Sequence, residues 1–417
     1  MLRTRNTLAC KYYIIIATLA LFPLFEYFFN LVNLQLRGTS TRIIHCGSEP
    51  GQEFGGVSPA LDFSSTFAQP APGEPVVFDY ARCGNPTRLA LERQLASLEH
   101  ANFAFATSSG MAAHITLMNL CQSGDHILCV DDVYGGTQRY LRKILGPNAN
   151  IEMSFEDFSD INKFKKMLRP NTKMVWLETP TNPTLKVFDI QKIAEACKGH
   201  GALFIVDNTF MTPINQNPLL LGADVVTHSL TKYIGGHSDL IAGMIAVNDR
   251  ELYDKLYFVL KTMGTGLDSF NSWLAMRSCK TLEVRVNKAM SNAMAIAKHL
   301  EKHPKVQRVI YPGLKSHPQY NIVQKQCKGP GAMISFYVKG GIKHAERLLK
   351  NLHLFTLAES LGGVESLIEN PALMTHGSVP VAQRKLLGIE DNFIRMSVGI
   401  ENEEDLIADL NHAFTKV

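Results

Sequence analysis

The residues with the clearest chemical potential are a carboxylate and a lysine that follow two short apolar runs. The run at 203–206 ends in Asp207, and the run at 225–227 leads into a His-Ser-Leu-Thr-Lys segment that ends at Lys232. A buried carboxylate is costly unless a cation pairs with it. A lysine can bind an aldehyde covalently and then act as a base. Because ligands of open α/β sheets bind at the carboxyl ends of the strands, we expect both groups to face one ligand.

A turn of small residues at 107–113 adds an anion site. Its sequence, Thr-Ser-Ser-Gly-Met-Ala-Ala, leads into a predicted helix, whose free backbone N–H groups and positive dipole end attract a phosphate. We expect the amides of Gly110 and Met111 to hold that phosphate together with the hydroxyls of Ser229 and Thr231. One ligand uses an amine that binds its aldehyde, a phosphate site and a carboxylate for its protonated ring nitrogen, and that ligand is pyridoxal 5'-phosphate.

Pyridoxal phosphate gives each of these residues a role. Lys232 is expected to form the Schiff base and then to remove the substrate Cα proton. Asp207 would keep the pyridine nitrogen protonated, so that the ring can accept electrons. Tyr134, in a Val-Tyr-Gly-Gly segment, would stack on the ring face. Each residue type is common at such a place in other proteins, and it is their joint order and spacing that support this interpretation.

The elements that must position these residues indicate an α/β domain followed by a smaller α+β domain. Short apolar runs typical of buried parallel strands alternate with helical stretches. They lie at residues 103–106, 127–130, 174–177, 203–206 and 225–227. A helix is expected to open at Pro86 with Thr87 as its N-cap, and a long helix is expected at 283–302. Strands at 333–338 and 394–398 follow.

The chain therefore divides into a leader, an arm and two domains. We expect a leader over residues 1–38 and an extended arm over 39–80, where Gly, Pro and Ser are frequent. A large cofactor-binding domain with a mostly parallel central sheet is expected over 81–283. A smaller C-terminal domain is expected over 284–417.

The leader is apolar and basic. Its four basic residues and one acidic residue account for most of the formal charge of +4. The stretch at 12–36 is long enough for a membrane span, which needs about 20 residues, although Pro23 and Glu26 interrupt it. Three interpretations stay open: an anchor that contacts a membrane through 12–36, a cleaved signal peptide, and a start-site artefact or leader without bearing on activity.

The composition of the whole chain narrows its class. Hydrophobic residues make up 46% and charged residues 19% of the 417 residues, which fits a globular protein with a large core and excludes a disordered one. Without a basic stripe, nucleic acid is not an expected partner. The eight cysteines form no CxxC pair and no Cys/His cluster with metal-ligand spacing, so we expect reduced thiols, a cytoplasmic location and no metal site.

From about Thr41 to the C-terminus the chain resembles the Cys/Met metabolism family of pyridoxal-phosphate enzymes of fold type I, the group of the cystathionine γ-lyases and γ-synthases. Many motifs match in order, which makes the resemblance specific. They are YARCGNPT at 80–87, SGMAA at 109–113, DVYGGT at 132–137, ETPTNP at 178–183, VDNTF at 206–210, SLTKY at 229–233, AESLGG at 358–363, MTH at 374–376 and IRMSVG at 394–399.

The resemblance implies roles that periodicity alone does not supply. Tyr80 and Arg82 match positions that reach the cofactor phosphate of the neighbouring subunit, which implies a homodimer, usually within a homotetramer. Positions that hold the substrate α-carboxylate are matched by Asn182, Ser360 and Arg395. The planar guanidinium of an arginine suits bidentate pairing with that group. Other positions that line the substrate site are matched by Arg139 and Thr375.

Asp79 and Glu359 bear on the choice of substrate within the family. Two acidic groups suit the distal amino group of cystathionine, whereas bacterial β-lyases of the family carry aromatic or apolar residues there. Gly136 stands where methionine γ-lyases carry a cysteine. The resemblance thus implies γ-elimination of L-cystathionine to cysteine, 2-oxobutyrate and ammonia. The alternatives are a γ-synthase or β-lyase of the same family and, from another class, a catalytically degenerate membrane-tethered binding protein.

Overall fold

The computed structural model describes residues 37–51, 55–377, 379 and 381–417. The predicted leader, including its stretch at 12–36, lies outside the described residues except for Arg37 and Gly38. Among the helices of the described ranges, none combines the length and the apolar character that crossing a bilayer requires.

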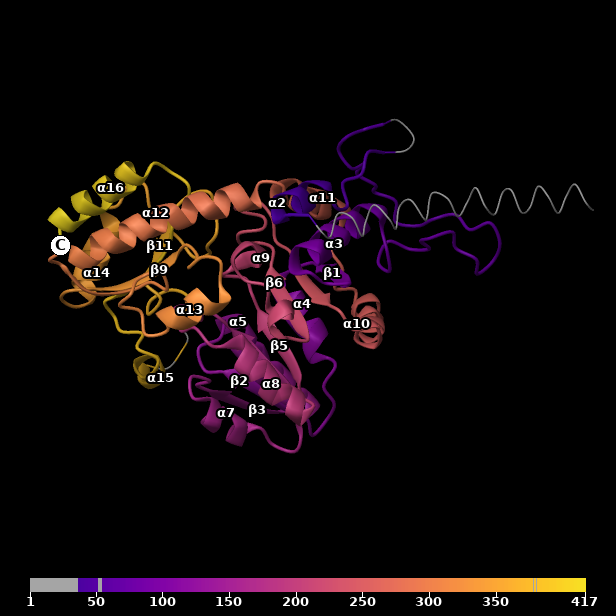
Figure 1. The fold of residues 1–417 in the computed structure, drawn as a ribbon, viewed down its shortest axis with the longest axis horizontal. Coiled ribbons are helices and arrows are strands. Elements are labelled where there is room, and N and C mark those ends of the chain that lie inside the picture. The colour runs from indigo at the N-terminus through magenta and orange to yellow at the C-terminus, as the bar shows by residue number, and fades with distance from the viewer. Residues whose placement is uncertain (1–36, 52–54, 378, 380) are drawn as a thin grey trace, which may run out of the picture.

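A seven-stranded sheet forms the core of the larger part of the fold (Figure 1). Its strands are β1 (Phe103–Thr107), β2 (His126–Val130), β3 (Glu152–Glu156), β4 (Thr172–Glu178), β5 (Leu203–Asp207), β6 (Val225–Ser229) and β7 (Gly243–Val247). They lie in the order β1-β7-β6-β5-β4-β2-β3. Only β7 runs antiparallel to its neighbours, β1 and β6. The predicted α/β class with a mostly parallel sheet is therefore confirmed.

The five predicted strands are all present in this sheet, and two others, β3 and β7, were not predicted. The residues of β3 are no more than half-buried, so they lack the apolar run that marks the other strands. The run Gly-Met-Ile-Ala-Val of β7 lies next to β1 and β6, so its antiparallel insertion between them depends on contacts distant in sequence.

Helices cover both faces of the sheet because successive strand residues point to opposite sides. Val225 and Ile245 belong to one hydrophobic cluster, whereas the adjacent Val226 and Met244 belong to the other. The first cluster includes residues of α4 (Gly110–Met118), α7 (Ile161–Met167), α8 (Ile190–His200) and α10 (Arg250–Met263). The second includes residues of α3 (Pro86–Glu99), α11 (Ser269–Cys279) and α12 (Leu282–Lys302).

Shorter helical segments connect these elements. They are α2 (Thr39–His45), α5 (Gly135–Tyr140), a π-helix (Leu141–Leu145), α6 (Gly146–Ala149), α9 (Thr212–Asn215) and a 3-10 helix (Pro218–Leu221). The first of them, α2, packs on α3, so the segment that the sequence predicts as an extended arm begins with a helix.

The C-terminal part is built on a five-stranded sheet. Its strands are β8 (Val306–Ile310), β9 (Met333–Val338), β10 (Thr356–Leu357), β11 (Leu367–Glu369) and β12 (Phe393–Ser397), in the order β10-β11-β12-β9-β8. Its other helices are α13 (Tyr320–Gln326), α14 (Ile342–Lys350), α15 (Val381–Leu386) and α16 (Glu403–Thr415). The long helix α12 packs on β8, β9 and α16, and Figure 1 shows it running from the large part into this one.

The N-cap of α3 differs from the sequence prediction. Asn85, not Thr87, caps the helix, and its Oδ1 accepts hydrogen bonds from the amides of Thr87 and Arg88 at 2.9 and 3.2 Å. The hydroxyl of Thr87 instead binds the arm, donating to the carbonyl of Ala60 and accepting from the amide of Asp62. The prediction of Thr87 as the cap was wrong because the hydroxyl has these tertiary partners.

Replacing Asn85 with alanine should lower the free energy of unfolding by about 1 kcal/mol, because two amides of the first turn lose their acceptor. Asn85→Asp keeps the acceptor and should retain most of the stability. Denaturant unfolding of both variants tests this. Equal losses in the two variants would show that the cap does not contribute as described.

Candidate active site

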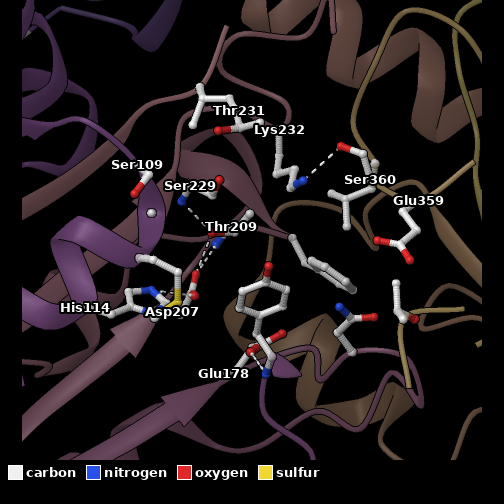
Figure 2. Close-up of a pocket in the computed structure, with 18 of the residues that line it drawn as sticks. Ser109, His114, Glu178, Asp207, Thr209, Ser229, Thr231, Lys232, Glu359 and Ser360 are labelled. Carbon is white, nitrogen blue, oxygen red and sulfur yellow. Dashed lines mark hydrogen bonds and ion pairs between the residues drawn. The ribbon is translucent and has the colours of Figure 1, made fainter. Parts of the chain in front are cut away.

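Most of the predicted site residues line one cavity, which lies between the carboxyl ends of the large sheet and the C-terminal part (Figure 2). The cavity has a volume of about 290 Å³. The predicted residues that line it are Gly110, Met111, Tyr134, Asn182, Asp207, Ser229, Thr231, Lys232, Glu359, Ser360, Thr375 and Arg395. Segments far apart in the sequence thus bring an amine, carboxylates, hydroxyls and a guanidinium together.

Four predicted residues lie elsewhere in the described chain. Asp79 borders a separate cavity of about 170 Å³ beside α3. The guanidinium of Arg82 lies 5.6 Å from the ring centre of Tyr80 and donates to the carbonyl of Lys261. Arg139 is exposed in the last turn of α5. One chain by itself does not bring these side chains to Lys232.

The amine of Lys232 lies at the centre of the cavity, in the turn after β6. Its Nζ donates a 2.8 Å hydrogen bond to Oγ of Ser360. Burial, and then the charge of Arg395, lower the pKa of Lys232 to about 8, against the opposite effects of Glu359 and Glu369. A larger share of neutral amine near physiological pH is what a lysine needs to attack an aldehyde or to take a proton.

The loop that carries Ser360 approaches the lysine closely. Ser360 has φ +84°, a left-handed value that is uncommon for a residue with a side chain. At Gly362, with φ +77°, an added Cβ would lie 2.6 Å from the amide nitrogen of Tyr233 and 3.0 Å from the carbonyl carbon of Lys232. Only glycine fits there, so the loop can bring Ser360 against the amine.

The carboxylate of Asp207 is buried, accepts two hydrogen bonds from Thr209 and lies beside His114. Its Oδ1 accepts from the amide of Thr209 at 3.0 Å and from the hydroxyl of Thr209 at 2.5 Å. Its Oδ2 lies 3.3 Å from Nε2 of His114. Burial alone would raise the pKa of Asp207, but the contacts with His114 and Thr209 lower it below its ordinary value. An ionised carboxylate here can pair with a protonated ring nitrogen.

The start of α4 forms the cradle that the sequence predicts. Ser109 caps the helix, with its Oγ accepting from the amide of Ala112 at 3.0 Å. The first two residues of the helix, Gly110 and Met111, line the same cavity as Ser229. An added Cβ on Gly110 would lie 3.0 Å from Cβ of Ser229, so a glycine lets the helix approach the strand end this closely. Backbone amides and hydroxyls at a helix start suit a phosphate.

A buried guanidinium faces the other side of the cavity. Arg395, on β12, is 3% exposed and donates to Oδ1 of Asn182 at 2.9 Å and to the carbonyl of Ser360 at 2.8 Å. Its Nε lies 3.0 Å from Oε1 of Glu369, which also accepts from the hydroxyl of Thr375. The residues predicted to hold a carboxylate therefore contact one another around a single cation.

Sequence reasoning missed four residues of this site: His114, Glu178, Thr209 and Glu369. Glu178 lies beside Asp207 in the sheet register, and its Oε2 accepts from the amide of Tyr134 at 2.9 Å. Burial, and then the charge of Asp207, raise the pKa of Glu178 well above its ordinary value. Glu178 and Glu369 both end apolar strands, the same signal that identified Asp207.

These groups fit pyridoxal phosphate. The amine of Lys232 can bind the aldehyde, the ionised Asp207 can pair with the ring nitrogen, and the start of α4 can take the phosphate. The half-exposed ring of Tyr134 lines the same cavity and is available to stack on a planar ligand.

Comparisons with known proteins point to the same chemistry. The family described as Cys/Met metabolism PLP-dependent enzyme matches residues 40–415. Cystathionine gamma-lyase from Dictyostelium discoideum is 50% identical over 377 residues, which cover 90% of this chain and 97% of that protein. Cystathionine beta-lyase from Coxiella burnetii is 48% identical, over 89% of this chain and 97% of that protein. A solved structure of cystathionine gamma-lyase from Lactobacillus plantarum with L-serine has a TM-score of 0.88 and 41% identity, over 91% and 99% of the two chains.

The depressed pKa of Lys232 predicts how the protein freed of cofactor reloads. Only the neutral amine attacks an aldehyde, so the rate of covalent loading with pyridoxal phosphate should rise with pH, with its midpoint at about 8. Stopped-flow absorbance of the bound cofactor measures it, and Lys232→Ala should give no covalent band. A midpoint near ~10.4, the value of an ordinary lysine, would contradict the described environment.

Proposed function

The chain belongs to the Cys/Met metabolism family of pyridoxal-phosphate-dependent enzymes, and from this premise we propose that it cleaves L-cystathionine by γ-elimination. Cystathionine and water would give cysteine, 2-oxobutyrate and ammonia. The observation that carries the proposal is the presence of Glu359 in the same cavity as Lys232 and Arg395. An amino-acid substrate with a second ammonium group at its far end needs such a carboxylate.

The substrate is proposed to bind by its α-carboxylate. Arg395 presents its two terminal nitrogens beside Asn182 and Ser360, so an incoming carboxylate can exchange for those contacts. Glu359 would then accept the distal ammonium group. A positive and a negative group in one cavity would each pair with the opposite charge of the substrate and so orient it.

Lys232 is proposed to carry the proton transfers. When bound, pyridoxal phosphate accepts the electron pair that remains after a proton leaves the substrate Cα. The amine of Lys232 takes that proton and, because its pKa is lowered to about 8, can pass the proton on near physiological pH. A proton must also leave Cβ before the Cγ–S bond breaks and the sulfur departs as cysteine. Tyr134 and Asp207 would hold the cofactor ring from its face and its nitrogen.

Three predicted site residues lie away from the cavity of their own chain, which suggests a dimer. We propose that Asp79, Tyr80 and Arg82 reach the cavity of a second copy, in a homodimer or homotetramer. The segment before them extends from the body of the protein in Figure 1. It exposes large apolar side chains that a partner would cover: Val57, Phe63, Val76 and Val77, each 70–79% exposed. Arg139 is proposed to line the outer substrate site.

We also propose the domain boundaries of an arm over 39–80, a cofactor domain over 81–283 and a C-terminal domain over 284–417. In support, each sheet lies wholly on one side of the start of α12 at Leu282. The cytoplasm remains the proposed compartment, since the seven cysteines of the described residues are free thiols. A membrane contact through 12–36 would place the same enzyme at a bilayer.

A β-elimination of cystathionine is the second candidate, because a relative named cystathionine beta-lyase is nearly as similar to this chain as one named gamma-lyase. A γ-synthase would share the same cavity and differ in its co-substrate. The built site around Lys232 and Asp207 gives no support to a degenerate binding protein.

Product analysis tests the proposed reaction. The cofactor-loaded protein given L-cystathionine should release cysteine and 2-oxobutyrate in equal amounts, as measured by chromatography. Lys232→Ala should release neither. Homocysteine and pyruvate would instead identify β-elimination and overturn the proposal, and turnover that requires an activated homoserine ester with cysteine would identify a synthase.

Subunit mixing tests the proposed dimer. Arg82→Ala and Lys232→Ala should each be nearly inactive alone. If Arg82 serves the neighbouring subunit, mixed and re-formed oligomers should regain up to roughly a quarter of wild-type activity, because one hybrid site in each mixed dimer is intact. Light scattering gives the size of the particles. Mixed oligomers without activity, or a monomer with full activity, would contradict the shared site.

A further inference from the structure

His114 is a buried histidine for which the proposed reaction has no role. It lies on α4, one turn after Gly110, and is 3% exposed. Its Nδ1 lies 2.9 Å from the hydroxyl oxygen of Thr137. The edge of its ring packs on Trp176, with ring centroids 4.6 Å apart and an interplanar angle of 70°. The imidazole therefore extends from α4 and contacts residues of α5 and β4.

The remaining ring nitrogen of His114 faces Asp207. Nε2 lies 3.3 Å from Oδ2, an ion-pair distance, and within the described part of the chain it has no hydrogen-bond partner (Figure 2). Both donors from Thr209 go to Oδ1, so His114 is the neighbour that supports Oδ2. Of the salt bridges in the described ranges, the one that involves Asp207 is this contact.

Without His114 the environment of Asp207 would stabilise its ionised form less. The carboxylate is 6% exposed, and its neighbour in the sheet register is another acid, Glu178. Burial disfavours the ionised form of Asp207, and a second carboxyl group beside it supplies no compensating positive charge. Thr209 supplies neutral donors, whereas an imidazole can supply a donor and a positive charge.

We propose that His114 is a positioning residue for the cofactor, which keeps the Asp207 carboxylate ionised and oriented so that it can pair with the protonated ring nitrogen of pyridoxal phosphate. This inference rests on the proposed role of Asp207, and it is independent of which substrate the enzyme cleaves. His114 acts through Asp207 and needs no contact with the substrate.

The charged groups around this pair set the sign of the pH effect. On β4 Glu178 faces Asp207. The charge of Asp132 raises the pKa of Glu178, and the charge of Arg395 lowers it. On α5 the group that faces His114 is the uncharged hydroxyl of Thr137. Removing the imidazole leaves only the hydrogen bonds from Thr209 to oppose the effect of burial on the pKa of Asp207, so the carboxylate would take up a proton at a higher pH. Cofactor binding should then weaken at a higher pH as the solution is acidified.

Two variants separate the contact of Nε2 with Asp207 from the space that the imidazole ring fills. His114→Met keeps a side chain of similar length without a donor, whereas His114→Gln places an amide N–H near the position of Nε2. The measurement is the affinity of the cofactor-free protein for pyridoxal phosphate across the acid and neutral range, by equilibrium dialysis and by absorbance. Thermal unfolding of the cofactor-free proteins is the control for folding.

His114→Met should bind the cofactor roughly tenfold or more weakly at neutral pH, the size expected for one hydrogen bond to a charged group. The acid limb, the fall of this affinity as the pH is lowered, should move to higher pH. His114→Gln should recover much of the affinity. An affinity and acid limb of His114→Met equal to wild type would overturn the proposal, as would a His114→Gln variant no better than His114→Met.

Two further variants cover the remaining outcomes. If His114→Met does not fold, Thr137→Val removes the partner of Nδ1 and should shift the acid limb in the same direction by a smaller amount; an unchanged limb would overturn the proposal. Asp207→Asn should bind the cofactor more weakly than either histidine variant. Wild-type binding by Asp207→Asn would refute the role of Asp207 itself, without bearing on the products formed from cystathionine.

Discussion

The guanidinium of Arg395 joins the two parts of the structure at the site. It extends from β12 in the C-terminal sheet, donates to Asn182 of the large part, and donates to the backbone of the loop at Ser360. A buried cation of this kind is tolerated only with a compensating charge, and Glu369 supplies it at 3.0 Å. The position of the two sheets relative to each other, and hence the shape of the cavity, depends on this set of contacts.

The chemistry of the lysine follows from the same contacts. Ser360, which Arg395 holds through its carbonyl, accepts the hydrogen bond from Lys232. The C-terminal part also removes water from the amine, and burial and the charge of Arg395 are the two largest causes of its lowered pKa. A lysine in the turn after β6 without that cover would be an ordinary cation. Both parts of the fold are therefore needed for Lys232 to act as a base. The cofactor-binding residues predicted from strand ends, in contrast, all belong to the large part.

The sequence predicts what depends on local pattern. Asp207 and Lys232 could be identified because each follows an apolar strand, and the fold class because such strands alternate with helices. Glu178 and Glu369 also end apolar strands and could have been identified in the same way. His114 could not, since it lies within a helix and its partners come from distant segments. β7 was missed for the same reason, because its insertion between β1 and β6 is set by tertiary contacts. Arg395 and Asn182 came from the family resemblance, and Asp79, Tyr80 and Arg82 remain predictions that involve a second copy.

The central claim is that one cavity binds an amino acid between Arg395 and Glu359, with its Cα beside Lys232. A crystal structure of the cofactor-loaded protein with a cystathionine analogue in which a methylene group replaces the sulfur tests this directly. The account predicts the α-carboxylate on Arg395, the distal ammonium group at Glu359, and the amine of Lys232 within reach of the Cα proton. An analogue bound in the reverse direction, or with its α-carboxylate away from Arg395, would contradict it.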